Sequence, residues 1–316
     1  MNSGKILFID TAHPYLTEEL TRVGFHCDHY TGLNRQEILD MLHQYTGVII
    51  RSKIKLDKVA LNYATNLKFI GRVGAGMENI DLDAAEAKGI ICLNAPEGNR
   101  DAVAEHAMGM ILALLNHLLK VDAEVRKGIW IREGNRGIEI KGKTVGIIGF
   151  GNTGSEFARR LMGFGARVLA YDKYKSGFSS DWVEEATMDR IFEEADFLSL
   201  HIPLTEETYY LVNSEYIEKF KKPIYVINTS RGQCVNTADL MDAIDRGKVL
   251  GASLDVLEIE KLSFENLDTS NIPESFKRLF SSDKVILSPH IAGWTHESNY
   301  KLAWHLAEKI KNLTVS

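Results

Sequence analysis

Residues 145–154 read Val-Gly-Ile-Ile-Gly-Phe-Gly-Asn-Thr-Gly, an apolar run that leads into the glycine pattern G-x-G-x-x-G. The pattern alone is weak evidence, but here it opens a helical segment, 155–164, and a second apolar run then ends at Asp172. Gly149 permits a tight turn, Gly151 lets a ligand approach the backbone, and Gly154 allows the helix to pack closely on the strand. This order predicts a βαβ unit that binds a dinucleotide.

The first helix of that unit would offer its N-terminal N–H groups to a pyrophosphate. We therefore expect cofactor contacts from Gly149, Phe150, Gly151, Asn152, Thr153 and Gly154. Asp172 follows at the position where a carboxylate accepts hydrogen bonds from a ribose 2′-hydroxyl and repels a 2′-phosphate, which predicts NAD as the cofactor. Two alternatives are a glycine-rich turn without a ligand and a 2′-phosphate accommodated by Lys173 and Lys175.

Apolar runs alternate with amphipathic segments along the rest of the chain. Strands are expected at 5–10, 26–30, 47–51, 67–73, 90–94, 145–148, 167–171, 197–201, 225–228, 251–254 and 284–287. A long helix is expected over 99–127, followed by a polar loop. The alternation predicts an α/β fold with two doubly wound parallel-sheet domains, and small-molecule sites usually lie between such domains.

Composition excludes several classes of protein. Of 316 residues, 45% are hydrophobic and 25% charged, which are ordinary globular proportions, and the net charge of −6 gives no basic surface for nucleic acid or anionic lipid. The three cysteines lie far apart, with no spacing typical of metal ligands, and no metal is expected. The start of the chain shows no signal peptide, and the apolar stretch 102–121 carries charges, so we expect a cytoplasmic protein without a membrane span.

Three later segments carry a family resemblance: Asn228-Thr-Ser-Arg-Gly232, the stretch from Leu254-Asp-Val to Glu260, and Ser288-Pro-His-Ile-Ala-Gly293. Together with the glycine fingerprint they resemble the D-isomer-specific 2-hydroxyacid dehydrogenases over nearly the whole chain. Residues 50–52, 71–76, 79–81 and 93–99 are similar to the phosphoglycerate dehydrogenases of that family in particular.

The resemblance implies a Rossmann NAD-binding domain inserted in a flavodoxin-like substrate domain. The substrate domain would comprise residues 1–98 and 287–316, and the NAD-binding domain residues 99–286. It also implies a homodimer, with a homotetramer possible, built through the helix 102–119 and an arm around Trp130; the alternative is that this helix belongs to a monomer's core. Because the chain ends at Ser316, we expect a short form without an amino-acid-binding regulatory domain.

The resemblance also assigns the chemistry. His290 would be the general acid/base, since imidazole exchanges protons near neutral pH, and Arg231 would bind the substrate carboxylate as a planar fork. Glu260 matches the carboxylate that orients this histidine. The chain departs from the family at the next position, where Lys261 replaces a common proline, and Glu258 competes for the same role.

Further contacts follow from the same resemblance. Asp255 would contact the nicotinamide carboxamide, with Thr229, Ser230, His290 and Gly293 near the ring, and His201, Pro203 and Thr205 would form a loop over the cofactor. Backbone N–H groups of the segment Val73, Gly74, Ala75 and Gly76 would bind the substrate carboxylate.

Three arginines match positions that hold a distal phosphate: Arg51, Arg72 and Arg132, the last reaching across from a partner subunit. They favour oxidation of D-3-phosphoglycerate to 3-phosphohydroxypyruvate, the first step toward serine. Within the class, the alternatives are a glycerate, glyoxylate/hydroxypyruvate or D-lactate dehydrogenase. A remote alternative from another class is an NAD(H)-sensing corepressor-like binding protein. The segment 261–287 is longer than expected and has no assigned role.

Overall fold

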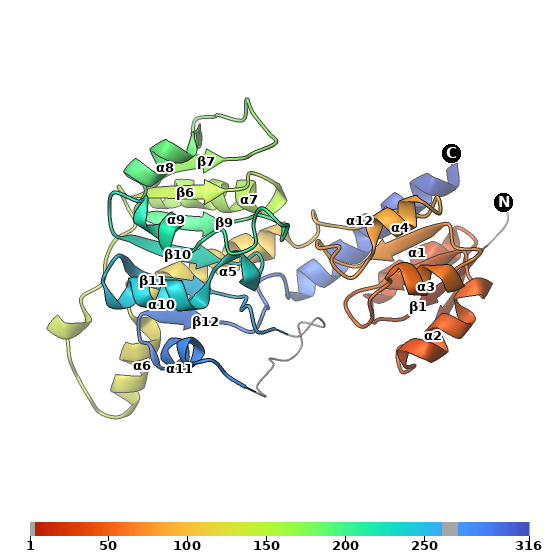
Figure 1. The fold of residues 1–316 in the computed structure, drawn as a ribbon, viewed down its shortest axis with the longest axis horizontal. Helices are drawn as coiled ribbons and strands as arrows, with labels where there is room; N and C mark the ends of the chain where they lie inside the picture. The colour runs from red at the N-terminus through yellow and green to blue at the C-terminus, as the bar shows by residue number, and fades with distance from the viewer. Residues whose placement is uncertain (1–3, 261–270, 316) are drawn as a thin grey trace. The chain divides into compact units, whose positions relative to one another are not determined.

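The structure is a computed structural model that describes residues 4–260 and 271–315 (Figure 1). It divides into two compact units. Unit 1 comprises residues 4–100 and 294–315 of the described chain, and unit 2 comprises residues 101–260 and 271–293. The prediction of two doubly wound parallel-sheet domains is confirmed, since every strand pair in both sheets is parallel.

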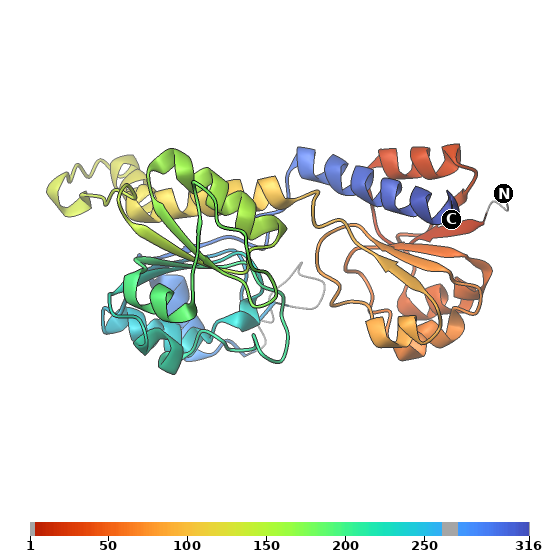
Figure 2. The ribbon, with the colours of Figure 1, turned by 90° about the horizontal axis from the view of Figure 1, so that it is seen from above.

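Unit 1 is built on a five-stranded sheet of order β2-β1-β3-β4-β5. Its strands are β1 (Lys5–Phe8), β2 (His26–His29), β3 (Gly47–Ile50), β4 (Phe69–Arg72) and β5 (Ile91–Leu93). Helices α1 (Pro14–Arg22) and α12 (His296–Val315) cover one face, and α2 (Arg35–Met41), α3 (Lys58–Tyr63) and α4 (Leu82–Glu86) cover the other (Figure 2). This strand order is that of the flavodoxin-like fold.

Strand alternation explains why both faces of this sheet are covered. Ile6 and Phe8 of β1 pack under α1 and α12, whereas Leu7 and Ile9 pack under α2 and α3, and all four are fully buried. An uninterrupted apolar strand of this kind is stable only when helices cover both of its faces.

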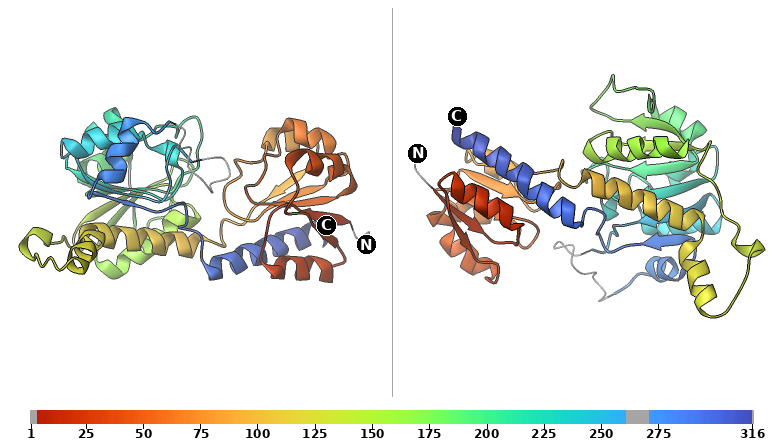
Figure 3. Two further views of the ribbon diagram at one scale, coloured as in Figure 1. Left: turned by 90° about the horizontal axis from the view of Figure 1, so that it is seen from below. Right: turned by 180° about the vertical axis from the view of Figure 1, so that it is seen from behind.

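Unit 2 contains a seven-stranded sheet of order β12-β11-β10-β9-β6-β7-β8. Its strands are β6 (Thr144–Ile148), β7 (Arg167–Tyr171), β8 (Glu184–Glu185), β9 (Phe197–Leu200), β10 (Ile224–Asn228), β11 (Val249–Leu254) and β12 (Val285–Leu287). Helices α5 (Arg100–Leu115) and α7 (Asn152–Leu161) lie on one face; α8 (Met188–Glu194), α9 (Ser214–Glu218), α10 (Thr237–Asp245) and α11 (Glu274–Ser281) lie on the other (Figures 2 and 3). The strand order reverses between β6 and β9, where sheets of this type bind ligands beyond the carboxyl ends of the strands.

The second boundary between the units lies later than the sequence suggested. The predicted change at 286/287 falls at 293/294, because β12 pairs with β11 and the loop after it is hydrogen-bonded to Asp255. The first boundary, predicted at 98/99, lies at 100/101. Of the segment 261–287, residues 261–270 lie outside the described residues, and α11 packs on α10 with Phe276 buried.

The prediction of a single helix over 99–127 is wrong. The segment is divided into α5 and α6 (Leu118–Arg126) at His117, whose left-handed backbone (φ 52°) bends the two helices by 59°. α6 has no buried residue, and Trp130 in the arm that follows is 79% exposed. The dimer through this arm stays a prediction, which light scattering would check. In the described part of the chain no single helix is long and apolar enough to span a membrane, although the bent pair α5–α6 passes that test together.

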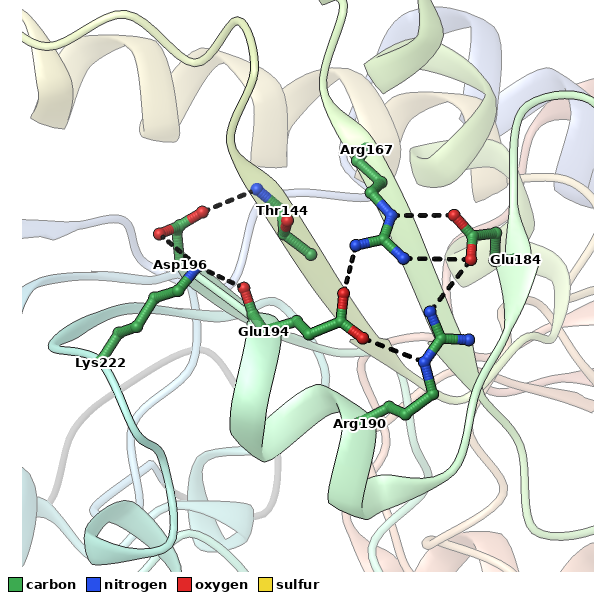
Figure 4. Close-up of polar contacts among 7 residues, drawn as sticks. All are labelled: Thr144, Arg167, Glu184, Arg190, Glu194, Asp196 and Lys222. Atoms are coloured by element: carbon green, nitrogen blue, oxygen red, sulfur yellow. Dashed lines mark hydrogen bonds and ion pairs between the residues drawn. The ribbon is translucent and has the colours of Figure 1, made fainter.

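Strand β8 was not predicted, because it is only two residues long and both are glutamates. Charges hold this edge of the sheet: Arg167 of β7 bonds Glu184 of β8 at 2.8 Å and also Glu194 of α8, and Arg190 bonds both glutamates (Figure 4). Arg167, followed by Arg190, lowers the pKa of Glu184 to about 2. Such a network holds an exposed edge in place better than an isolated surface pair does.

Candidate active site

The glycine-rich turn between β6 and α7 has the geometry of a phosphate cradle. Gly149 is in a left-handed conformation (φ 91°), and a Cβ on Gly154 would lie 2.0 Å from the oxygen of Gly149. A Cβ on Gly151 would meet nothing within 4 Å. The turn therefore leaves space at Gly151, directly before the N-terminus of α7, and a pyrophosphate fits such a space.

We predict that Gly151→Ala and Gly154→Ala fail in different ways. At Gly151 the backbone (φ −87°, ψ −154°) suits an alanine, so the melting temperature should change little while the Kd for NADH rises at least about tenfold, because the methyl group occupies the cradle. Gly154→Ala should lower the melting temperature by several degrees, because its methyl group overlaps backbone. Calorimetry and NADH fluorescence titration of both variants check this, and unchanged NADH affinity in Gly151→Ala would place the cofactor elsewhere.

Asp172 follows β7 beside this turn. Its carboxylate accepts hydrogen bonds from the backbone N–H groups of Phe150 (2.8 Å), Tyr174 (2.9 Å) and Lys175 (3.0 Å). A carboxylate offers about four acceptor positions, so one remains for a ribose hydroxyl. The two lysines considered for a 2′-phosphate have other partners: Lys173 pairs with Glu207, and Lys175 donates to the oxygen of Phe150.

His201 lies beneath the turn. Its backbone oxygen would be 2.4 Å from a Cβ on Gly149, its Cβ would be 3.3 Å from a Cβ on Gly154, and its Nε2 is 2.9 Å from Ser199 Oγ. Burial lowers the pKa of His201 to about 3, so the ring is neutral at physiological pH. The His201 residue therefore packs against the turn as a structural support. Pro203 and Thr205 lie in the loop after it, held by Thr208.

In the segment after β10, one hydroxyl group has a structural partner and the other has none among the described residues. Ser230 Oγ donates to the oxygen of Leu200 at 2.8 Å and so ties the ends of β10 and β9 together. Thr229 Oγ1 is buried, and within residues 4–260 and 271–315 it has no hydrogen-bond partner. Because a buried hydroxyl without a partner is costly, Thr229 is the better candidate of the two for a cofactor contact.

Glu260 and His290 form the central pair of the site. Glu260 Oε2 lies 2.7 Å from His290 Nδ1, and its Oε1 accepts a hydrogen bond from the backbone N–H of Leu257. The competing Glu258 instead accepts from the N–H of Thr237 at 3.3 Å. Since a carboxylate only accepts, Nδ1 of His290 is the donor to Glu260, and Nε2 is the ring nitrogen that Glu260 does not engage.

Asp255 holds the loop that carries His290. Its carboxylate, 1% exposed, accepts from Ser288 Oγ (2.6 Å) and from the N–H groups of Ile291 (2.9 Å) and Ala292 (2.8 Å). Its backbone oxygen accepts from the N–H of His290 at 2.7 Å. Contact of Asp255 with the nicotinamide stays a prediction; what the structure adds is that most of its acceptor capacity serves this loop.

Arg231 reaches the same edge of the sheet. It lies three residues after β10, the strand that pairs with β11, and β12 follows on the other side of β11. A Cβ on Gly232 would lie 2.0 Å from the carbonyl carbon of Leu257, so the Arg231 loop packs on the segment that positions Glu260. The predicted trio thus comes from three neighbouring strand ends of unit 2.

In unit 1 the predicted substrate residues lie at the carboxyl ends of β3 and β4. The guanidinium of Arg51 stacks 4.2 Å from the ring centre of Trp294, and Arg72 folds over Gly74, donating to the oxygen of Val73 at 3.3 Å. The N–H groups of Val73 and Gly74 donate to the backbone oxygens of Ile50 and Arg72, whereas those of Ala75 and Gly76 have no acceptor among the described residues. The predicted anion nest is therefore reduced to two groups.

Two further predicted site residues are Arg132 and Gly293. Arg132 is exposed in the arm after α6, and Gly293 is the last residue of unit 2. Trp294 and His106 were not predicted as site residues: the tryptophan had no motif, and the histidine lay in an apolar helical segment. Among the residues that the structure describes, no three His, Cys, Asp or Glu side chains are placed to hold a metal ion.

The model of the D-isomer specific 2-hydroxyacid dehydrogenase, NAD binding domain, matches residues 108–292. The D-3-phosphoglycerate dehydrogenase of Archaeoglobus fulgidus is 35% identical over 98% of this chain and 57% of its own length, so this chain spans little more than half of that relative. The hydroxypyruvate reductase of Thermotoga maritima is 37% identical over 88% of each chain.

Solved structures of similar fold point to the same family. The D-lactate dehydrogenase of Aquifex aeolicus, complexed with NAD and lactic acid, superposes with a TM-score of 0.83 at 29% identity, covering 98% of this chain and 95% of that one. The matched segment contains the glycine turn, Arg231, Glu260 and His290, which unit 2 assembles at one sheet edge. The chain belongs to the D-isomer specific 2-hydroxyacid dehydrogenase family, and unit 2 carries that family's NAD-binding domain.

Proposed function

We propose that this protein is an NAD-dependent dehydrogenase that interconverts a D-2-hydroxy acid and its 2-oxo acid. The observation that carries the proposal is the Glu260–His290 pair, with Oε2 and Nδ1 2.7 Å apart, on the same sheet edge as a phosphate-binding turn. An acid/base imidazole beside a dinucleotide site suits transfer of a proton together with a hydride.

Each residue has one task in this proposal. When bound, NAD would supply the acceptor for the hydride from C2 of the substrate, and His290 Nε2 would take the hydroxyl proton in oxidation. Glu260 holds Nδ1 as a donor and stabilises the imidazolium that forms. Arg231 binds the substrate carboxylate, for which a guanidinium supplies two parallel hydrogen bonds. In reduction, the same histidine returns the proton to the carbonyl oxygen.

We propose D-3-phosphoglycerate and 3-phosphohydroxypyruvate as the substrate pair. Support comes from the relatives of that name and from Arg51 and Arg72, which follow or end adjacent paired strands, with Ile50 opposite Arg72 in the register. Two guanidinium groups at one sheet edge suit a dianionic phosphate. The N–H groups of Ala75 and Gly76 would receive the carboxylate.

Hydroxypyruvate reduction is the second candidate. The relative of that name matches this chain over 88% of both lengths, unlike the longer phosphoglycerate dehydrogenases. The two substrates differ by one phosphate, so kinetics separate them.

We predict that the double variant Arg51→Gln, Arg72→Gln raises the KM for 3-phosphohydroxypyruvate at least about tenfold, because phosphate contacts are charge-assisted. The KM for hydroxypyruvate should change by less than about threefold. Arg22→Gln is the matched control, since Arg22 is an exposed arginine of unit 1 paired with Glu19. Equal changes for both acids would assign the arginines a structural role and favour the unphosphorylated substrate.

A further inference from the structure

A polar cluster of unit 2 lies next to the His290 loop, and one of its members, His106 of α5, has no task in the proposed chemistry. His106 Nε2 of α5 is 2.8 Å from Ser288 Oγ and 3.5 Å from Asp255 Oδ1, and Ser288 Oγ is 2.6 Å from the same carboxylate oxygen. Asp255 is 1% exposed and the side chain of His106 is 25% exposed. The cluster joins His106 of α5 to Ser288, which lies 182 positions later in the chain.

The directions of these hydrogen bonds follow from the number of protons available. A carboxylate only accepts, so the single hydroxyl proton of Ser288 goes to Asp255 over the short 2.6 Å contact. Ser288 Oγ must then accept from His106, which requires the proton on Nε2. This arrangement is not that of a nucleophilic serine, whose hydroxyl donates to the histidine and whose aspartate contacts Nδ1.

What the cluster supports is the backbone of the acid/base loop. His290 has a left-handed conformation (φ 55°), which is rare for a residue other than glycine. Such a conformation persists only where surrounding contacts impose it. Here the contacts are the bonds to Asp255 from the N–H groups of His290, Ile291 and Ala292. Ser288, in turn, holds the carboxylate that accepts two of them.

We propose that His106 is a positioning residue for His290, acting through Ser288 and Asp255; the proposal rests on His290 being the acid/base group. By donating to Ser288, His106 directs the hydroxyl proton toward Asp255. The carboxylate is then held in the orientation that binds the loop and keeps His290 opposite Glu260. The imidazole of His106 does not exchange a proton with substrate.

The test compares His106→Leu, which removes the donor, with His106→Gln, whose amide nitrogen reaches the same place. With a 2-oxo acid that the enzyme reduces, His106→Leu should lower kcat about tenfold, with the KM and the Kd for NADH changed less than about threefold. His106→Gln should restore kcat to within about threefold. Gly109→Ala, on the same helix where a Cβ meets nothing within 4 Å, is the control and should leave kcat unchanged.

A double-variant cycle tests the route through Ser288. If His106 acts through the hydroxyl, adding His106→Leu to Ser288→Ala should lower kcat little further, because the route is already broken. Additive losses, or a kcat for His106→Leu equal to that of the parent, would overturn the proposal. The proposal would also be overturned if His106→Leu lowered the melting temperature and His106→Gln restored neither the melting temperature nor kcat. His290→Asn is measured in parallel: if it keeps full turnover, the proposed function fails, whereas loss in His290→Asn alone removes only the role of His106.

Discussion

His290→Asn should lower kcat by at least about 10²-fold in both directions, since the general acid/base is lost. Asparagine is the sharpest replacement here for two reasons. Its amide reproduces Nδ1 and keeps a donor toward Glu260, and it tolerates the left-handed backbone that position 290 requires. The variant therefore loses Nε2, the proposed acid/base atom, and retains the loop. Stopped-flow measurement of NADH oxidation, with NADH affinity determined separately, gives the result.

The affinity measurement makes this prediction specific. We expect the Kd for NADH to stay within about threefold of the parent's, because the phosphate cradle lies on the same sheet edge but at the ends of different strands, β6 and β7. If His290→Asn turned over at a rate near that of the parent, the pair with Glu260 would be structural. If His290→Asn lost both its affinity for NADH and its folding stability, the loss of kcat could not be assigned to the acid/base group. His290→Gln would then be measured in its place, with the same expected loss in kcat of at least about 10²-fold.

Arg231→Gln should lower kcat/KM by at least about 10²-fold, because one residue provides both the charge and the fork that bind the carboxylate. Arg231→Lys should recover only a small part, since an ammonium group keeps the charge without the fork. Gly232 keeps its close contact with Leu257 in both variants, so the loop remains in place. Steady-state kinetics over a range of 2-oxo acid concentrations give the ratio.

The control for Arg231 is Arg246→Gln, which removes an exposed arginine of the same unit that pairs with Glu218. We expect this control to leave kcat/KM unchanged. A comparable loss in the control would point to the net charge of unit 2 as the cause. Full recovery by Arg231→Lys would argue against a bidentate carboxylate contact.

Much of the fold could be predicted from the sequence because two local signals agree. Strands of a parallel sheet covered on both faces are short apolar runs, and Gly149 and Gly154 are required by a turn that leaves no room for a Cβ. The break at His117 could not be predicted, because its left-handed conformation falls on a histidine. The two-residue strand β8 escaped because it has no apolar pattern.

The candidate site could also be predicted from the sequence only in part. Motifs placed Glu260 and His290 at neighbouring strand ends, but they left Glu258 and Glu260 as rivals two residues apart. The backbone after β11 decides between them, since it directs Glu258 toward Thr237 and Glu260 toward His290. His106 could not be predicted, because its partner lies 182 positions away and only the packing of α5 brings them together.

We propose that this chain reduces 2-oxo acids to D-2-hydroxy acids with NADH. The most direct test supplies the purified protein with NADH and, in separate reactions, 3-phosphohydroxypyruvate, hydroxypyruvate, glyoxylate and pyruvate. NADH consumption is followed by absorbance, and the products with a stereocentre are identified by chiral chromatography. We expect D products, a preference for NADH over NADPH, and a kcat/KM for the phosphorylated acid at least about tenfold above the others, which is about 1.4 kcal/mol of discrimination. Failure to reduce any of the four acids, or formation of L products, would rule out the proposed activity.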